Sequence, residues 1–227
     1  MTERERIDIF LDSFYEGNHG FLAGLEEKAM AEGVPLIRPG TQVFLKTLIS
    51  AVKPLHVLEI GTAVGFSALL MCEAGPREIH VATIEQDSLR AAQARENIRS
   101  AGRASQVTIL EGEAGGILRQ MNDCREEDPL YHLRPGEGFD LIFMDAAKGQ
   151  YIHWLPDVLK LMHSGSILVS DNCLQEMELL ESHYAVRRRD RTIYRRMREY
   201  LFALTHEKRL QTSILPVGDG IALSVML

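Results

Sequence analysis

The apolar positions of this chain change their period near residue 55, and the change predicts two kinds of structure. In residues 1–33 the apolar side chains recur at helical spacing, so we expect one or two amphipathic helices there. Residues 34–40 contain two prolines and interrupt the pattern, and Thr41 is then expected to cap a third helix. From residue 56 onward, short apolar runs alternate with helical stretches, which is typical of repeated βα units.

The alternation predicts an α/β fold, a mostly parallel sheet with helices on both faces. The expected strands are His56–Ile60, Ile79–Ile84, Val107–Leu110, Asp140–Met144, Ser166–Val169, Thr212–Leu215 and Ile221–Met226. The expected helices are Gly65–Glu73, Ser88–Ala101, Ala114–Met121, Tyr151–His163 and residues 189–205. The last two strands are close enough to form a hairpin, which would make one of them antiparallel to the rest.

Length and composition narrow the class of protein. With 227 residues, 45% hydrophobic and 25% charged, the chain fits one domain over residues 1–227. Residues 1–50 would form a helical cap, and the polar residues 122–138 an inserted surface loop. No apolar run approaches the roughly 20 residues that span a bilayer, and the charged start leads into no signal-like stretch, so we expect a cytoplasmic protein without a membrane partner. The odd number of widely separated cysteines, Cys72, Cys124 and Cys173, fits reduced thiols.

The first candidate site is a glycine turn after the first predicted strand. Gly61 and Gly65 form a G-x-x-x-G spacing, which differs from the dinucleotide fingerprint because position 63 is alanine. A glycine here lets the backbone approach a ligand closely. Glu59 stands in the otherwise apolar strand, where a buried carboxylate needs partners. A cationic ligand group could supply them, and a satisfied structural glutamate is the alternative.

Two further acidic residues follow the next two strands. Glu85 ends the second strand, where a carboxylate can accept hydrogen bonds from both ribose hydroxyls of an adenosine cofactor. NAD enzymes share this device, so Glu85 alone does not identify the cofactor. Glu113 lies in a turn after the third strand that would suit an adenine ring. An ordinary acidic residue at a helix N-terminus is an equally good interpretation of Glu113.

Oxygen ligands follow two later strands. Asp145 ends one strand, and Asp171 with Asn172 ends the next. Two carboxylates and an amide oxygen suit Mg²⁺, Mn²⁺ or Ca²⁺ and would leave about three octahedral positions for water and substrate. Strand-terminal Asp and Asn are also common turn formers. The pair at adjacent strand ends favours a metal site.

Lys148 lies three residues beyond Asp145, close enough to face the same site. Beside a divalent cation a lysine is pushed toward its neutral form and can act as a base near neutral pH. The alternative is a surface lysine that opens the following helix. His153 and Trp154 are expected to be packing or rim residues.

These motifs together resemble one family, the cation-dependent, S-adenosylmethionine (SAM)-dependent O-methyltransferases of the catechol and caffeoyl-CoA type. The matching segments, in order, are VLEIGTAVGFSALL, TIEQD, EGEAG, FDLIFMDAAKGQY and ILVSDN. The resemblance implies a Rossmann-like class I methyltransferase fold, a seven-stranded sheet with one reversed strand, and a homodimer.

The resemblance also implies a role for each matching residue. Glu59, Gly61 and Ser67 would line the methionine end of the cofactor, Glu85 would hold its ribose, and Glu113 with Ala114 would border its adenine. Ile37 would close over the cofactor. Asp145, Asp171 and Asn172 would bind the cation, Mg²⁺ or Mn²⁺. Asp145 would also contact the cofactor. Lys148, as the base, and Asp145 would be the catalytic residues.

The acceptor is the least constrained part of the reaction. Seven arginines fall within residues 187–198, a local positive patch on a chain with a formal charge of −7. Four of them are possible RNA contacts: Arg187, Arg188, Arg191 and Arg195. Within the family this stretch resembles the bacterial tRNA 5-hydroxyuridine methyltransferases, so the preferred acceptor is the 5-hydroxyl of 5-hydroxyuridine in tRNA.

Other interpretations stay open at this point. A small catechol-like or caffeoyl-CoA-like phenol offers the same vicinal oxygens as the hydroxyuridine base. The arginines would then belong to a solvated or subunit-facing helix paired with acidic residues. A non-catalytic nucleotide-binding module and an NAD(P) oxidoreductase are the alternatives from other classes.

Overall fold

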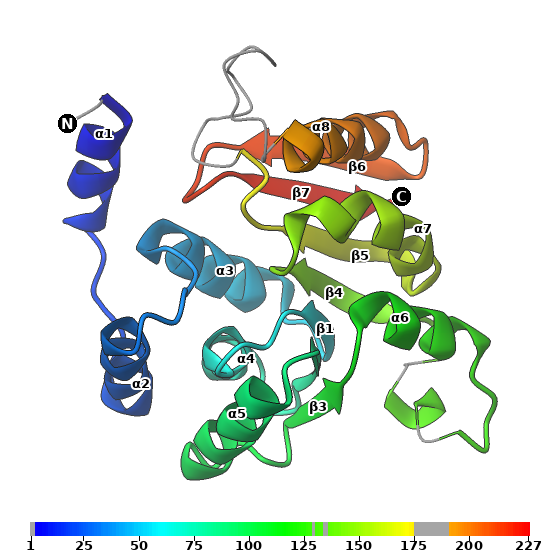
Figure 1. The fold of residues 1–227 in the computed structure, drawn as a ribbon, viewed down its shortest axis with the longest axis horizontal. Coiled ribbons are helices and arrows are strands. Elements are labelled where there is room, and N and C mark those ends of the chain that lie inside the picture. The colour runs from blue at the N-terminus through cyan, green and yellow to red at the C-terminus, as the bar shows by residue number, and fades with distance from the viewer. Residues whose placement is uncertain (1–2, 129, 134–135, 175–190) are drawn as a thin grey trace.

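The computed structural model describes residues 3–128, 130–133, 136–174 and 191–227 (Figure 1). Its strands are β1 (His56–Ile60), β2 (His80–Glu85), β3 (Val107–Glu111), β4 (Phe139–Met144), β5 (Met162–Ser170), β6 (Leu210–Leu215) and β7 (Ile221–Met226). Its α-helices are α1 (Glu3–Asp12), α2 (Gly20–Ala31), α3 (Pro39–Val52), α4 (Phe66–Ala74), α5 (Ser88–Ser100), α6 (Ala114–Asp123), α7 (Tyr151–Lys160) and α8 (Arg191–His206). Two short 3₁₀ turns are η1 (Tyr131–Leu133) and η2 (Lys148–Gln150).

The strands form one seven-stranded sheet in the order β3-β2-β1-β4-β5-β7-β6. The first five strands are parallel, and β7 runs antiparallel to both of its neighbours, β5 and β6. The predicted hairpin and the predicted reversed strand are therefore confirmed. The chain order reverses between β1 and β4, and such a switch point is where open α/β sheets bind ligands, beyond the carboxyl ends of their strands.

The alternation of side chains along each strand builds two cores, one on each face of the sheet. Leu58 and Ile60 pack into the core beneath α6, α7 and α8, whereas Val57 packs into the core beneath α3, α4 and α5 (Figure 1). Strand β4 repeats the pattern, with Ile142 on the first face and Phe143 on the second. This period of two follows from the pleat of a strand.

The register between β4 and β5 places the two metal-site loops side by side. Met144 pairs with Ser170 in the parallel ladder, so Asp145 and Asp171 are the next residues on each strand. Neighbouring strands lie about 4.8 Å apart, which fixes the approach of the two loops. The sheet itself thus sets the separation of the two aspartates.

A polar network ties the N-terminal segment to α3. Asn18 donates to Glu26 and to Gln42 at 2.8 and 2.7 Å, and Lys46 donates to Asn18 at 2.7 Å. Gln42 then donates to the carbonyl of Ile37 at 3.0 Å. Helix α2 and the loop before α3 are therefore held together by a chain of hydrogen bonds, while α1 stands apart from the sheet (Figure 1).

The structure corrects two of the predicted boundaries. Helix α3 begins at Pro39, so Arg38 takes the cap position and Thr41 is a buried helical residue instead of the cap. Proline is favoured in the first turn because its fixed φ suits a helix and its missing N–H costs nothing there. Helix α7 ends at Lys160, three residues earlier than predicted, and His163 belongs to β5.

Two other expectations concern the surface and the cysteines. The described part of residues 122–138 contains the end of α6 and the 3₁₀ turn η1. The three cysteines are free, and Cys173 is buried, where its thiol contacts the Ser170 carbonyl at 3.2 Å. Among the described residues, no helix is long and apolar enough to cross a membrane.

Candidate active site

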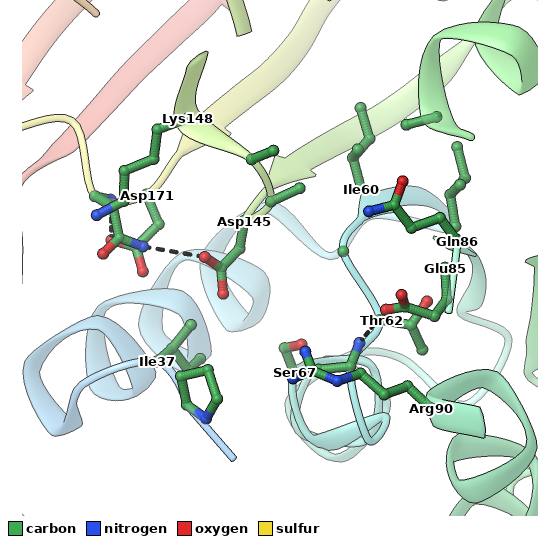
Figure 2. Close-up of a pocket in the computed structure, with 18 of the residues that line it drawn as sticks. Ile37, Ile60, Thr62, Ser67, Glu85, Gln86, Arg90, Asp145, Lys148 and Asp171 are labelled. Carbon is green, nitrogen blue, oxygen red and sulfur yellow. Dashed lines mark hydrogen bonds between the residues drawn. The ribbon is translucent and has the colours of Figure 1, made fainter. Parts of the chain in front are cut away.

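A pocket of about 690 Å³ opens at the carboxyl ends of β1, β2, β3, β4 and β5 (Figure 2). The loop before α3 and the β6–β7 turn contribute residues as well. Ten of the predicted site residues line it: Ile37, Gly61, Ser67, Glu85, Glu113, Ala114, Asp145, Lys148, Asp171 and Asn172. Segments far apart in the sequence thus meet in one cavity.

The glycine turn after β1 needs its glycines for two different reasons. Gly61 has a φ of +110°, and a Cβ there would overlap the carbonyl oxygen of Asp145. Gly65 has a φ of +83° and caps α4 in the left-handed region, which glycine adopts without strain. The turn can therefore lie against the β4 loop and leave the pocket open above it.

Glu59 does not line the pocket. It is fully buried on the α3–α5 face of the sheet, where Oε2 accepts a hydrogen bond of 2.5 Å from Thr83. Its Oε1 has no hydrogen-bond partner among the described residues. Burial raises the pKa of Glu59 to about 7, although hydrogen bonds from Ser67 and Thr83 oppose the shift. Because Ser67 contacts Glu59 and also lines the pocket, the Glu59 carboxylate lies one side chain behind the pocket wall.

The carboxylates of Glu85 and Glu113 organise the backbone of the cofactor end. Glu85 accepts hydrogen bonds from the amides of Ala63 and Asp87 at 2.8 and 2.9 Å. It therefore links the glycine turn to the loop after β2, and it also faces the pocket (Figure 2). Glu113 caps α6 by accepting hydrogen bonds from Gly115 and Gly116. The hydrogen bond from the Gly115 amide lowers the pKa of Glu113. Glu113 is therefore an acidic residue at a helix N-terminus, as the alternative interpretation held. It also lines the pocket, which is compatible with the predicted place beside the adenine.

The predicted metal ligands come together. Asn172 Nδ2 donates to Oδ1 of Asp145 at 3.0 Å, and the backbone N–H of Asn172 donates to Oδ1 of Asp171 at 2.7 Å. Figure 2 shows Asp145 and Asp171 in the pocket. Burial raises the pKa of both aspartates, and the charge of Asp145 raises that of Asp171 further. The charge of Lys148 lowers the pKa of both. The site therefore concentrates negative charge in a poorly solvated place.

Such a cluster fits a divalent cation by the chemistry of its donors. Two carboxylate oxygens and one amide oxygen are hard ligands, and a cation would offset the burial of like charges. In the described part of the chain, no three His, Cys, Asp or Glu side chains form a preformed metal cluster. The predicted ligands fall outside that definition, because the third ligand is the side-chain amide of Asn172.

Lys148 is held near these carboxylates by the turn η2. The Gln150 amide donates to the Ala147 carbonyl at 2.8 Å, which closes the turn. The buried Tyr151 fixes its base, since the phenol oxygen accepts from the Ala146 amide at 3.1 Å and donates to the Met144 carbonyl at 3.0 Å. The lysine thus extends from a rigid turn into the pocket (Figure 2).

Sequence reasoning missed the role of the β6–β7 turn. Asp219 lines the pocket, and its charge raises the pKa of both Asp145 and Asp171. Arg38, from the loop before α3, also lines the pocket and forms an ion pair of 2.7 Å with Asp219. The only sequence signal was the Gly-Asp-Gly turn itself. Trp154, expected to be a packing or rim residue, is nearly buried and also lines the pocket.

The arginine stretch is only partly described. Arg187 and Arg188 lie outside the described residues, whereas Arg191 and Arg195 are on α8. Arg195 is exposed, 4.0 Å from Glu199 one helical turn away. Arg198 instead packs on Tyr194, with its guanidinium carbon 5.5 Å from the ring centre. The described arginines of α8 therefore make different contacts, Arg195 with an acidic side chain and Arg198 with an aromatic ring.

Comparison with known proteins identifies the class. The model of the O-methyltransferase family matches residues 14–227. A catechol O-methyltransferase of Niastella koreensis is 30% identical over 79% of this chain and 77% of its own. A caffeoyl-CoA O-methyltransferase of Populus kitakamiensis is 28% identical over 95% of this chain and 90% of its own.

Solved structures agree on the fold. The structure of an O-methyltransferase from Bacillus cereus in complex with SAH superimposes with a TM-score of 0.81 at 23% identity, over 98% of this chain and 97% of that one. TomG of Streptomyces achromogenes, an O-methyltransferase in complex with SAM, gives 0.80 at 22% identity, over 100% and 99%.

The fold and the pocket define a Rossmann-like class I methyltransferase. The chain belongs to the O-methyltransferase family and is a SAM-dependent O-methyltransferase. This assignment excludes the two alternative interpretations considered above, a non-catalytic nucleotide-binding module and an NAD(P) oxidoreductase.

Proposed function

We propose that this enzyme methylates one of two vicinal oxygens on a small catechol-like or caffeoyl-CoA-like phenol, with help from a divalent cation. The observation that carries the proposal is the convergence of Asp145, Asp171 and Asn172 with Lys148 in one pocket. A site of hard oxygen ligands beside a lysine suits an acceptor with two adjacent oxygens, because one cation can bind both.

The pocket residues divide between the two reactants. Gly61, Ser67 and Glu85 surround the end of the pocket that would hold SAM, which supplies an activated methyl group. Asp145, Asp171 and Asn172 would hold Mg²⁺ or Mn²⁺, and a cation there would lower the pKa of an acceptor hydroxyl and fix its orientation. Much of the rate gain would come from holding two reactants in line.

Lys148 would act as the base. Its amine would take the proton of the acceptor hydroxyl, so that the acceptor oxygen could bond to the methyl carbon of SAM while the carbon–sulfur bond breaks. The products would be a methyl ether, S-adenosylhomocysteine and a proton held on Lys148. The fixed turn η2 supports this role because a base must keep its place relative to the acceptor.

The relatives support a phenolic acceptor more directly than an RNA. The two relatives described above are named a catechol and a caffeoyl-CoA O-methyltransferase. The preference for tRNA that the arginine stretch suggested therefore becomes the second candidate. One observation favours it, the cluster of arginines at and before α8 on an acidic chain. A 5-hydroxyuridine base carries vicinal oxygens as a catechol does.

A single set of assays distinguishes the two acceptors. The protein is incubated with labelled SAM and Mg²⁺, and with either a panel of catechols and caffeoyl-CoA or tRNA bearing 5-hydroxyuridine. We expect methyl incorporation into the vicinal-diol phenols, its loss on chelation with EDTA, and its return with added Mg²⁺. Phenols with a single hydroxyl are the matched control and should react poorly.

Other results would overturn parts of the proposal. Incorporation into tRNA alone would replace the phenol with the second candidate. Full turnover after exhaustive chelation would remove the cation from the mechanism. Equal rates with catechol and with its single-hydroxyl analogue would show that adjacent oxygens are not required.

A further inference from the structure

One arginine of the α8 cluster points inward. Arg196 is half-buried, and its Nη1 donates to the carbonyl oxygen of Gly149 at 3.1 Å. Gly149 is the central residue of the turn η2, directly after Lys148. The neighbouring Arg195 is exposed and contacts Glu199 on its own helix. Two adjacent arginines of one helix therefore have different environments.

The contact belongs to a larger junction between α8 and the site loops. Tyr200 lies one helical turn after Arg196, so the two side chains share a face of α8. The buried Tyr200 hydroxyl lies 2.5 Å from the Ser170 hydroxyl, directly before Asp171. Its ring packs edge-on against Tyr151 at 5.4 Å. One face of α8 thus contacts the turn η2, the start of α7 and the end of β5, directly before Asp171.

The two ends of the lysine turn are held in different ways. The phenol of Tyr151 fixes the β4 side from within, through Met144 and Ala146. Arg196 holds the outer side at the Gly149 carbonyl. A hydrogen bond from a charged group is stronger than one between neutral groups. The backbone N–H of Tyr151 also donates to the Lys148 carbonyl, so Arg196 adds an outer contact to a turn that is already closed from within.

We propose that Arg196 is a positioning residue that fixes the turn η2 and thereby holds Lys148 in place for proton removal. This inference rests on the proposed function, because it takes Lys148 to be the base. It also gives Arg196 a different role from that of the arginines considered as RNA contacts. A displacement of about 1 Å in a catalytic group can lower a rate by as much as 100-fold, so a single anchoring contact can matter.

The test compares Arg196→Met with Arg198→Met, since both variants remove one positive charge from the same helix and Arg198 contacts Tyr194 instead of the turn. We expect Arg196→Met to lower kcat for a catechol acceptor roughly tenfold. The Kd for SAM and the melting temperature should stay close to those of the wild type. Arg198→Met should keep the wild-type kcat. Arg196→Lys, which retains one donor, should restore part of the loss.

A double-mutant cycle with Lys148→Met tests whether Arg196 acts through the lysine. In the Lys148→Met background, a further change of Arg196 to Met should leave the residual rate unchanged. If the two losses multiply, Arg196 acts on something else and the proposal is wrong. An equal loss of kcat in Arg198→Met would also overturn it, because charge alone would then explain the effect.

Hydrogen exchange supplies a readout that does not need turnover. We expect the amides of Gly149 and Gln150 to exchange faster in Arg196→Met than in Arg198→Met, in the full-length protein. Unchanged exchange would show that the contact does not hold the turn, whatever the acceptor. If the wild type instead methylates no phenol while exchange rises as expected, the acceptor proposal fails and the structural contact stands.

Discussion

Nδ2 of Asn172 lies 3.0 Å from Oδ1 of Asp145, which turns the amide oxygen of Asn172 away from that carboxylate. The residue also adopts a φ of 60°, in the left-handed region that Asn tolerates better than most side chains. One residue therefore combines an unusual backbone conformation with a link between two site loops.

Replacing Asn172 separates these two contributions. We expect Asn172→Gly to lower the cation-dependent rate about 10- to 100-fold without a loss of stability, since glycine adopts the left-handed region freely. Asn172→Ala should lose the same activity and, in addition, about 1–2 kcal/mol in the free energy of unfolding. Mg²⁺ titrations of activity and urea denaturation measure the two effects. Wild-type Mg²⁺ dependence in the glycine variant would remove Asn172 from the metal site.

Gly61→Ala tests the close approach between the β1 turn and the β4 loop. The new Cβ would overlap the Asp145 carbonyl oxygen, so the turn must shift, and we expect a loss of about 1–3 kcal/mol in unfolding free energy together with weaker SAM binding. Gly102→Ala is the matched control, because Gly102 also has a positive φ but a Cβ there meets open space. Gly102→Ala should lower the free energy of unfolding by less than Gly61→Ala does, and it should leave SAM binding intact. Equal effects of both substitutions would contradict the steric argument.

The buried carboxyl of Glu59 predicts a pH-dependent stability. Its pKa is raised from 4.5 to about 7, because burial disfavours the charged form. The folded state therefore binds this proton more tightly than the unfolded state does. The associated stability is fully present below pH 4.5 and is lost as the pH rises through about 7.

Glu59→Gln should remove that part of the pH dependence. We expect the variant to be more stable than the wild type near pH 8 by on the order of 3 kcal/mol, with a difference that shrinks toward pH 5. Urea denaturation of the SAM-free protein at several pH values measures the difference. The exposed Glu73→Gln should follow the wild-type curve. If Glu59 holds the methionine end as predicted, the glutamine variant should also bind SAM more weakly, and unchanged affinity would count against that role.

The Arg38–Asp219 ion pair connects the loop before α3 to the β6–β7 turn. The Arg38 side chain is about half exposed, so the pair contributes only about 0.2–1 kcal/mol. We expect Arg38→Gln to weaken SAM binding by no more than about fivefold, because Ile37 would lose part of its support. The effect should diminish in high salt, where exposed charges are screened. Calorimetric titration at two salt concentrations checks this, with the exposed Arg77→Gln as the control.

Much of the site follows from strand ends, which the sequence marks clearly. Asp145 and Asp171 each follow a run of apolar residues, and parallel strands bring such ends to one edge of the sheet. Glu85 was predictable for the same reason. The homodimer, the cytoplasmic location and the roles of individual side chains stay predictions.

The contributions that escaped prediction depend on contacts between distant segments. Asp219 reaches the site only because β7 is reversed and inserted between β5 and β6. Arg196 resembles its neighbours in the sequence, and only the packing of α8 distinguishes it. Thr41 looked like a cap because of its residue type, although the proline two residues earlier decided where α3 begins. Periodicity reports burial along one element and cannot report which element lies opposite.

The pairing of Met144 with Ser170 has a consequence for how the site can be altered. The gap between the two aspartates is a property of the backbone ladder, so the β6–β7 turn is not needed to maintain it. A substitution at Asp219 can therefore change the charge around the two aspartates without changing their spacing.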